Sequence, residues 1–362
     1  MVAIIACVML VSCAPSAKRK KEVINPNLSF YYWRTDFKLG ETERDWIKET
    51  RCQKMYVRFF DLDFEQYGSH PGVIPIGRLQ NIHEFPENVN VVPVVYITQD
   101  AIGALEDRLS LYTCAKRTVE KITRMAKRHG CNEIKEYQLD CDWTSQTKKV
   151  YFDFIEEIKK LVSPATVSVT LRLYQYKYRK ESGIPPADRV TLMYYNMGNF
   201  QSTEDKSYIL DNKTGVDYIR NTKPYPVKLD MALPLYYQSR LFSTAQSGFI
   251  SFISPQKFDL VEDLDFMQKK GIHTYEVHKN NWCTAYESAT RYQDFQPGLE
   301  DFCRAEWLID DKYEYEELEE AFNILKQTIN CSDFQVIFFH LDSTYLNNYN
   351  ANELKNMVSC MQ

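Results

Sequence analysis

The chain has 362 residues, of which 44% are hydrophobic and 26% charged, a composition typical of a globular protein with a substantial core. Its formal net charge of −5 provides no general attraction for nucleic acid, so nucleic acid is excluded as an expected partner. This length fits either one large α/β barrel or two smaller domains.

Aromatic residues make up 14% of the chain. They fit two interpretations, a large aromatic core and stacking surfaces for sugar rings, and composition alone leaves both open.

The amino terminus carries an uncharged apolar run, residues 2–12, that is too short to span a bilayer. It ends in Leu10-Val11-Ser12-Cys13, which resembles the lipobox of bacterial lipoproteins, although no Lys or Arg precedes the run. The resemblance implies that residues 1–12 are a signal peptide, that Cys13 is lipidated, and that residues 13–27 form a tether. An apolar amino terminus that simply frays is the alternative.

A lipidated Cys13 would anchor the protein to a membrane of the cell envelope. The basic run at residues 18–21 follows Cys13, where surface-exported lipoproteins of some Gram-negative bacteria carry acidic residues. The expected location is therefore the outer membrane, with the protein facing the periplasm. The same basic run fits a solvated linker or a contact with anionic head groups.

The rest of the chain alternates strand-like and helix-like segments. The predicted strands are residues 28–33, 54–62, 89–98, 134–143, 166–174, 189–197, 226–236 and 334–341. The predicted helices are residues 41–51, 112–128, 149–162, 208–221, 313–329 and 351–360. A loop is expected at residues 68–77, and an insertion of about residues 239–310 contains a short strand at 274–278.

Eight strands separated by helices predict a (β/α)8 TIM barrel, formed by a single domain over residues 28–362 with the insertion after strand 7. A doubly wound open sheet is the competing fold. Its dinucleotide-binding fingerprint, Gly-x-Gly-x-x-Gly, does not occur in the sequence.

The fourth predicted strand carries the main candidate site. Gln138, Asp140 and Asp142 alternate with apolar residues and therefore share one side, which we expect to face the barrel interior. The Cα atoms of Asp140 and Asp142 would lie ~7 Å apart, close enough for one carboxylate to raise the pKa of the other. A raised pKa suits a general acid, whereas an arginine within hydrogen-bonding distance would hold both carboxylates ionised. A helix cap or a structural ion pair is the simpler alternative.

Other polar and aromatic residues lie near predicted strand ends and should converge with this pair. The candidates for substrate binding are Gln138, Arg58, Arg172, Tyr195, Tyr236 and Trp143. Asp230, His340 and Asp342 share the same inward-facing pattern. Each arginine is either a substrate clamp or an ion-pair partner of the acids, each tyrosine is either a core residue or a ligand contact, and Trp143 is either a sugar platform or a helix-packing residue.

Metal and cofactor sites are not expected. His278 and Glu276 would share one side of a strand but His273 would not, and no third ligand accompanies the pair. No Cys-x-x-Cys pair occurs, and the suggested disulfide joins Cys283 to Cys303.

The fourth-strand segment Gln138-Leu-Asp140-Cys-Asp142-Trp143 resembles the Asp-x-Asp-x-Glu motif of chitinase-type glycoside hydrolases, which are (β/α)8 barrels. Residues 193–196, Met-Tyr-Tyr-Asn, resemble a Met-x-Tyr-Asp/Asn segment of the same family. The whole chain looks closer to uncharacterised bacterial TIM-barrel lipoproteins, which share the Leu-Asp-x-Asp strand and the Ala-Leu-Pro-x-Tyr segment at residues 232–236.

The family's catalytic Glu has two possible counterparts. Anchoring the motif on Asp-x-Asp-Trp places Thr144 at the acid position, whereas a shift by two residues places Asp142 there, with Asp140 and Gln138 preceding it. The second register, which we prefer, keeps an acid.

The sequence therefore predicts a glycoside hydrolase-like lipoprotein that acts on a glycan, with Asp142 as general acid and Asp140 as its supporting carboxylate. A barrel that binds a glycan or oligosaccharide without cleaving it is the alternative. A scaffold that meets a protein partner through its insertion is a third possibility.

Overall fold

The structure is a computed structural model, and it describes residues 27–67, 71–80, 85–105, 107–244, 248–262, 267–278 and 300–359. The predicted signal peptide, Cys13, nearly all of the tether and Cys283 lie outside these ranges. Among the described residues, no helix has both the length and the apolar character needed to cross a bilayer.

Eight parallel strands form a closed barrel. They are β1 (Asn27–Tyr32), β2 (Lys54–Glu65), β4 (Asn90–Ile97), β5 (Glu136–Asp140), β6 (Thr166–Arg172), β7 (Arg189–Met193), β8 (Lys228–Pro234) and β14 (Gln335–Phe339). Each pairs in parallel with its neighbour in chain order, and β1 closes the ring by pairing with both β14 and β2. The predicted (β/α)8 TIM barrel is confirmed.

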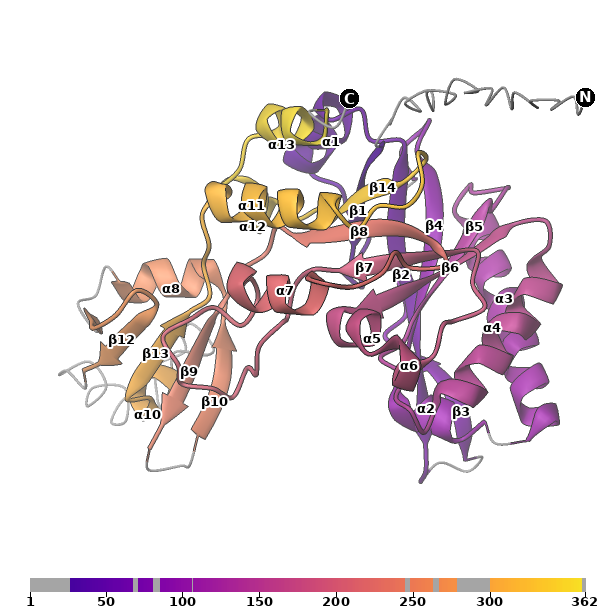
Figure 1. The fold of residues 1–362 in the computed structure, drawn as a ribbon, viewed down its shortest axis with the longest axis horizontal. Coiled ribbons are helices and arrows are strands. Elements are labelled where there is room, and N and C mark those ends of the chain that lie inside the picture. Colours follow the sequence, from indigo (N-terminus) through magenta and orange to yellow (C-terminus); the bar gives the residue numbers. More distant parts are fainter. Residues whose placement is uncertain are drawn as a thin grey trace, which may run out of the picture.

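Helices follow most strands and cover the outside of the barrel (Figure 1). They are α1 (Glu41–Glu49), α2 (Gln99–Gly103), α3 (Arg108–Arg128), α4 (Lys148–Val162), α5 (Leu173–Lys177), α6 (Arg179–Ser182), α7 (Asn212–Ile219), α11 (Tyr315–Lys326), α12 (Ser343–Leu346) and α13 (Ala351–Ser359).

Helix α3 begins earlier than the predicted residue 112 because the Asp107 carboxylate accepts hydrogen bonds from the backbone N–H groups of Leu109 and Ser110. Helix α7 lies within residues 208–221, the range that was expected to contain a helix. It begins after residue 208, where the backbone N–H of Tyr208 donates to the Asp311 carboxylate at 3.0 Å.

The segment predicted as a loop at residues 68–77 contains a strand, β3 (Gly72–Ile76). It pairs antiparallel with the end of β2, which extends past its barrel partner to Glu65. The prediction was wrong here because Gly and Pro residues suggested a turn, while Val73 and Ile74 pair with β2 as strand residues.

The insertion after β8 forms a second sheet, seen at the left of Figure 1. Its strands are β9 (Ser239–Ser243), β10 (Gly248–Ile253), β11 (Met267–Lys269), β12 (Thr274–Val277) and β13 (Trp307–Asp310), accompanied by α8 (Pro255–Glu262) and α10 (Glu300–Arg304). All strand pairs are antiparallel, and a separate apolar core that includes Leu241 and Leu308 lies in this unit.

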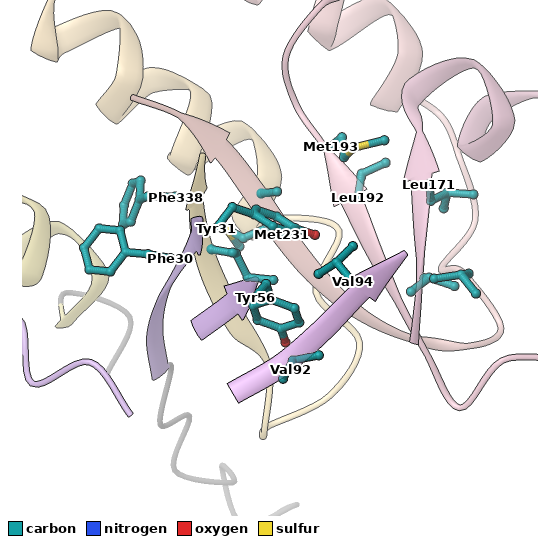
Figure 2. Close-up of a cluster of buried hydrophobic side chains, with 14 of the residues drawn as sticks. Phe30, Tyr31, Tyr56, Val92, Val94, Leu171, Leu192, Met193, Met231 and Phe338 are labelled. Atoms are coloured by element: carbon teal, nitrogen blue, oxygen red, sulfur yellow. The ribbon is translucent and has the colours of Figure 1, made fainter. Parts of the chain in front are cut away.

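Large aromatic side chains fill the barrel and the layer around it (Figure 2). The rings of Tyr31 and Tyr56 lie 5.3 Å apart by centroid, and both side chains are fully buried. Phe30 lies 6.1 Å from Phe338 and 6.3 Å from Trp46 of α1, so this part of the outer layer is also aromatic. Much of the aromatic content is therefore core.

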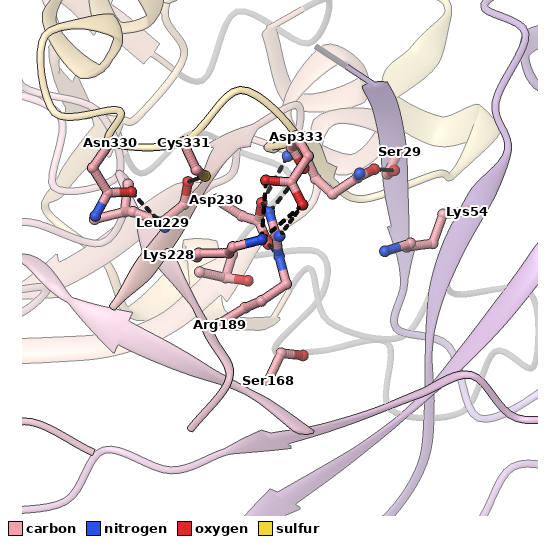
Figure 3. Close-up of polar contacts among 12 residues, drawn as sticks. Ser29, Lys54, Ser168, Arg189, Lys228, Leu229, Asp230, Asn330, Cys331 and Asp333 are labelled. Carbon is pink, nitrogen blue, oxygen red and sulfur yellow. Dashed lines mark hydrogen bonds and ion pairs between the residues drawn. The ribbon is translucent and has the colours of Figure 1, made fainter. Parts of the chain in front are cut away.

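A polar network occupies the amino-terminal end of the barrel (Figure 3). Arg189 donates to Asp230 at 2.9 Å and to Asp333 at 3.0 Å, while Lys54 donates to Glu136 at 2.7 Å. Asp230 lies near the start of β8, so the expectation that it would join a site at the carboxyl ends was wrong. Its carboxylate belongs to a buried ion pair at the opposite end of the barrel.

Candidate functional site

A cavity of about 430 Å³ opens at the carboxyl ends of the barrel strands. Every strand of the barrel contributes at least one lining residue from its end or from the residues just after it. The aromatic lining consists of Trp33, Tyr96, Tyr195, Tyr208, Tyr236, Phe252 and Phe339. The polar lining consists of Arg58, Asp61, Asp140, Arg172, Asn196 and Gln238. This is the face on which TIM-barrel enzymes carry their active sites.

The aromatic part of the cavity is organised around Phe339, the last residue of β14. Its ring centroid lies 5.6 Å from Trp33, 5.4 Å from Tyr195 and 5.4 Å from Tyr236. These four rings form a continuous apolar floor. Tyr195 and Tyr236 were predicted to belong to the site, and the cavity contains both.

The carboxyl of Asp140, the last residue of β5, is one of the two acids that line the cavity. Its side chain accepts a hydrogen bond of 2.6 Å from the Thr170 hydroxyl, and the residue is 9% exposed. Burial raises the pKa of Asp140 to about 6, and the nearby Asp142 carboxylate adds to this, while Thr170 and Arg172 act in the opposite direction. Asp140 therefore gains and loses a proton near neutral pH.

Asp142 is in a different environment two residues further along. Its two carboxylate oxygens accept from Nε and a terminal nitrogen of Arg172 at 2.6 and 2.9 Å. This paired geometry stabilises the carboxylate, and Arg172 engages both of its oxygens. The role predicted for Asp142, a protonated general acid, therefore fits Asp140 better.

A second ion pair lines the cavity wall. Arg58 of β2 donates a hydrogen bond of 2.7 Å to Asp61 and forms a second bond to the same carboxylate. The Arg58 guanidinium also lies 5.6 Å from the centroid of the Trp33 ring. Arg58 pairs with Asp61 of the cavity lining, whereas Arg172 pairs with Asp142, which is not among the lining residues. Both arginine side chains reach the cavity surface.

Asp61 and Trp33 were not among the predicted site residues. Alternation along β2 places Arg58 and Phe60 on one side, but the strand pairing shifts register between these two residues. This irregularity turns Asp61 into the cavity and Phe60 to the outside of the barrel. Trp33 had a detectable signal, since it is the last residue of the predicted aromatic strand 28–33.

Two predicted substrate contacts are not in the cavity. Gln138 is fully buried below it, where it accepts from Tyr31 at 2.7 Å and donates to Thr191 at 3.2 Å. Trp143 is also fully buried; its indole N–H donates to the backbone carbonyl of Ser182 at 2.9 Å, and its ring stacks on Tyr151. Gln138 therefore joins strands inside the barrel, and Trp143 packs against helices rather than forming a sugar platform.

His340 and Asp342, just after β14, also lie outside the cavity lining. Asp342 pairs with Arg34 and caps α12 by accepting from the backbone N–H of Thr344. Burial lowers the pKa of His340 to about 4, although Asp342 opposes this, so the imidazole is neutral at physiological pH. No group of three metal-ligating side chains occurs among the described residues, and Glu276 pairs with Lys270 instead.

The insertion forms one wall of the cavity, which the sequence did not predict. Gln238 and Phe252 line this wall, and the Phe252 ring lies 6.1 Å from Tyr208. The wall is held by Arg240, which binds the Asp311 carboxylate at 2.7 Å and the backbone carbonyl of Ser202 at 2.7 Å.

No protein-family model matches the chain, and no curated protein matches it. Among solved structures, 53 chains match. The spore cortex-lytic enzyme SleL of Bacillus cereus superposes with a TM-score of 0.52 at 13% identity, covering 92% of this chain and 74% of that chain. SleL of Bacillus megaterium QM B1551 gives a TM-score of 0.52 at 13% identity, covering 93% and 75%.

A chitinase from Chromobacterium violaceum ATCC 12472 superposes with a TM-score of 0.50 at 8% identity, covering 92% of this chain and 99% of that chain. Identities this low show a common fold and no more. In its fold, the chain is distantly similar to chitinase-type glycoside hydrolases.

Proposed function

We propose that the protein binds a glycan in the cavity at the carboxyl ends of the barrel strands. The observation that carries the proposal is the floor of four aromatic rings around Phe339, bordered by carboxylate, amide and guanidinium groups. Sugar rings present C–H faces that pack on aromatic rings and hydroxyls that bind such polar groups. That one structural neighbour is a chitinase supports the same ligand class.

Binding without cleavage is the function that the cavity supports best. Hydrolysis by the usual pair of carboxylates requires one acid and a second carboxylate that is free to act as base or nucleophile, and only a substrate-assisted reaction proceeds without that second carboxylate. Here the Asp142 carboxylate forms an ion pair with Arg172, and the Asp61 carboxylate forms an ion pair with Arg58. Thr144, the other counterpart of the family's acid, is exposed and bonds within its own turn to Thr147.

The test is calorimetric titration of oligosaccharides, combined with mass spectrometry of any products. Replacing Trp33 with Ala removes one ring of the floor and should weaken glycan binding by roughly tenfold or more. Tyr67→Ala, which removes an aromatic ring that is 90% exposed and outside the cavity, should leave the affinity unchanged. If Trp33→Ala and Tyr67→Ala bind equally well, the glycan does not use this floor.

Hydrolysis remains a second candidate function because of one observation, the protonatable carboxyl of Asp140 inside the cavity. A carboxylic acid with a pKa near the working pH can donate a proton to a leaving group. If the protein cleaves its glycan, Asp140→Asn should reduce turnover by about 10²-fold or more while glycan binding persists. The sequence alone favours Asp142 as the acid. In contrast, we expect Asp142→Asn to reduce turnover less than Asp140→Asn does.

We also propose that Cys13 carries the lipid anchor and places the protein in the cell envelope, supported by the lipobox-like residues 10–13. Metabolic labelling with an alkyne fatty acid should label the wild type, and Cys13→Ala should abolish the label and release the protein from the membrane fraction. Labelling that survives Cys13→Ala would contradict the assignment.

A further inference from the structure

A second concave surface lies outside the barrel, between the β2–β3 hairpin and helix α3. It encloses about 960 Å³, which lies in the range typical of small-molecule sites. Its lining includes the apolar side chains of Phe60, Leu62, Val73 and Leu105. None of its lining residues also lines the cavity of the proposed glycan site, so this groove is a separate feature.

One wall of the groove is cationic. Arg117, Lys121 and Arg124 follow one another at helical spacing along α3 and all line the groove. Arg78 and Arg128 lie close enough to act on Lys121: burial lowers the pKa of the Lys121 ammonium, and the charges of Arg78, Arg124 and Arg128 lower it further.

The cationic wall has no carboxylate partner within the described ranges. Among the described residues, no ion pair includes a cation of the wall (Arg117, Lys121, Arg124) or its neighbours Arg78 and Arg128. Asp107 lines the groove too, but its carboxylate is occupied in capping α3. Glu120 is the other acid in the lining. In a chain whose net charge is −5, this local excess of positive charge indicates an anionic ligand.

The apolar part of the groove continues to its rim. Phe60 lies under Lys121, whose ammonium is 5.2 Å from the centroid of the ring. At the rim, Leu109 is 74% exposed and Phe64 is 36% exposed. Exposed apolar side chains around a concave surface indicate a ligand with an apolar portion as well as a charged one.

We propose that this groove binds single molecules of an anionic amphiphile, with an acyl chain on the apolar floor and a carboxylate or phosphate head against Arg117, Lys121 and Arg124. An extended acidic peptide fits less well, because its pairing with the open edge of β3 would meet Pro75, which has no N–H to donate. The concave shape favours single molecules over a flat membrane surface.

The experiment is calorimetric titration of the purified protein with sodium decanoate and with decyl phosphate below their micelle concentrations. Tetraethylene glycol monodecyl ether has the same chain with a neutral head that is not a sugar, and inorganic phosphate is the head group alone. Decanoate and decyl phosphate should bind at least about tenfold more tightly than either control, because only they satisfy both parts of the groove.

Charge reversal tests the cationic wall. Lys121→Glu and Arg124→Glu should each weaken decyl phosphate binding by roughly tenfold or more. Lys116→Glu makes the same change in charge at an exposed position of α3 outside the groove lining, and it should leave binding close to wild type. Thermal unfolding of the three variants verifies that each is folded.

Three results would overturn the proposal. Equal binding of tetraethylene glycol monodecyl ether would remove the role of the charges, and equal binding of inorganic phosphate would remove the role of the apolar floor. Binding to vesicles of phosphatidylglycerol without binding of the monomeric amphiphiles would assign the surface to a membrane instead.

Discussion

At the scale of single residues, the neighbouring acids Asp140 and Asp142 differ because their partners differ. Asp142 meets the guanidinium of Arg172 with both oxygens, whereas Asp140 receives one hydroxyl hydrogen bond in a buried position. A neutral hydrogen-bond donor stabilises a carboxylate less than a guanidinium does. Both oxygens of Asp142 are therefore engaged by Arg172, whereas Asp140 can be protonated.

The raised pKa of Asp140 has a consequence for stability. Because the folded carboxyl has a pKa of about 6, above its ordinary value of 3.8, the folded state binds this proton more tightly than the unfolded state does. Asp140 therefore lowers the free energy of unfolding progressively as the pH rises from about 4 to about 6, and the loss is complete above that range.

Asp140→Asn removes this penalty and keeps an oxygen that can accept from Thr170. The variant should be more stable than wild type by roughly 1–3 kcal/mol at about pH 7.5 and little changed at about pH 4. Chemical denaturation at the two pH values measures the difference. An Asn variant that is less stable than wild type at the higher pH would show that Asp140 is not strained by its burial.

Arg172 lowers the pKa of Asp140, so its removal should have the opposite effect. In Arg172→Met, the titration midpoint of Asp140 should move upward, because the positive charge that favours its ionised form is gone. NMR titration of the labelled aspartate carboxyl carbons follows this directly. A midpoint that stays in place would mean that the Arg172 charge is screened from Asp140.

At the scale of elements, a buried arginine of the insertion, Arg240, helps to hold the insertion to the segment after β7. Arg240 is 1% exposed by side chain and Asp311 is fully buried, and Arg240 also donates to the backbone carbonyls of Phe200, Ser202 and Lys206. These bonds fix the segment after β7 against β9. They thereby place Tyr208 and Phe252 at the cavity.

Truncating Arg240 should lower the free energy of unfolding substantially. Arg240→Met leaves a buried carboxylate without its cation and should lower the free energy of unfolding by about 3–5 kcal/mol. Arg220→Met breaks the exposed pair with Asp217 and should cost only about 0–1 kcal/mol. Urea denaturation measures the free energy of unfolding of the two variants. Equal losses in both would contradict the role of Arg240 in holding the insertion to the barrel. The double variant Arg240→Met with Asp311→Leu should recover part of the loss.

At the scale of the whole molecule, two sheets have separate apolar cores, one in the barrel and one in the insertion. The insertion leaves and rejoins the barrel at adjacent points, since the backbone N–H of Asp311 donates to the carbonyl of Gln238 at 3.0 Å. The barrel core therefore does not depend on residues 239–310 for its own packing.

Deletion of the insertion tests this independence. A chain in which a short Gly/Ser linker replaces residues 239–310, with Asp311→Asn to remove the unpaired buried charge, should keep the barrel's circular dichroism and unfold cooperatively. Its glycan affinity should fall by roughly tenfold, because the wall containing Phe252 is lost. Failure of this chain to fold would show that the barrel needs the second sheet.

The barrel and the convergence of most of its site residues could be predicted from the order of strands and helices along the chain. Parallel strands with helices between them have few other ways to close, and alternation of polar residues on a strand fixes the side that they share. That argument placed Asp140, Arg172 and Arg58 at one end of the barrel, where the cavity is.

The remaining features of the site depend on how the strands are placed in space. Alternation cannot locate the register shift after Arg58, which turns Asp61 inward, or measure depth along a strand, which places Gln138 below the cavity. It also cannot show which acid meets Arg172, because that contact joins strands β5 and β6 from residues thirty apart in the chain. Such contacts depend on distances between strands, and a pattern within one strand does not contain those distances.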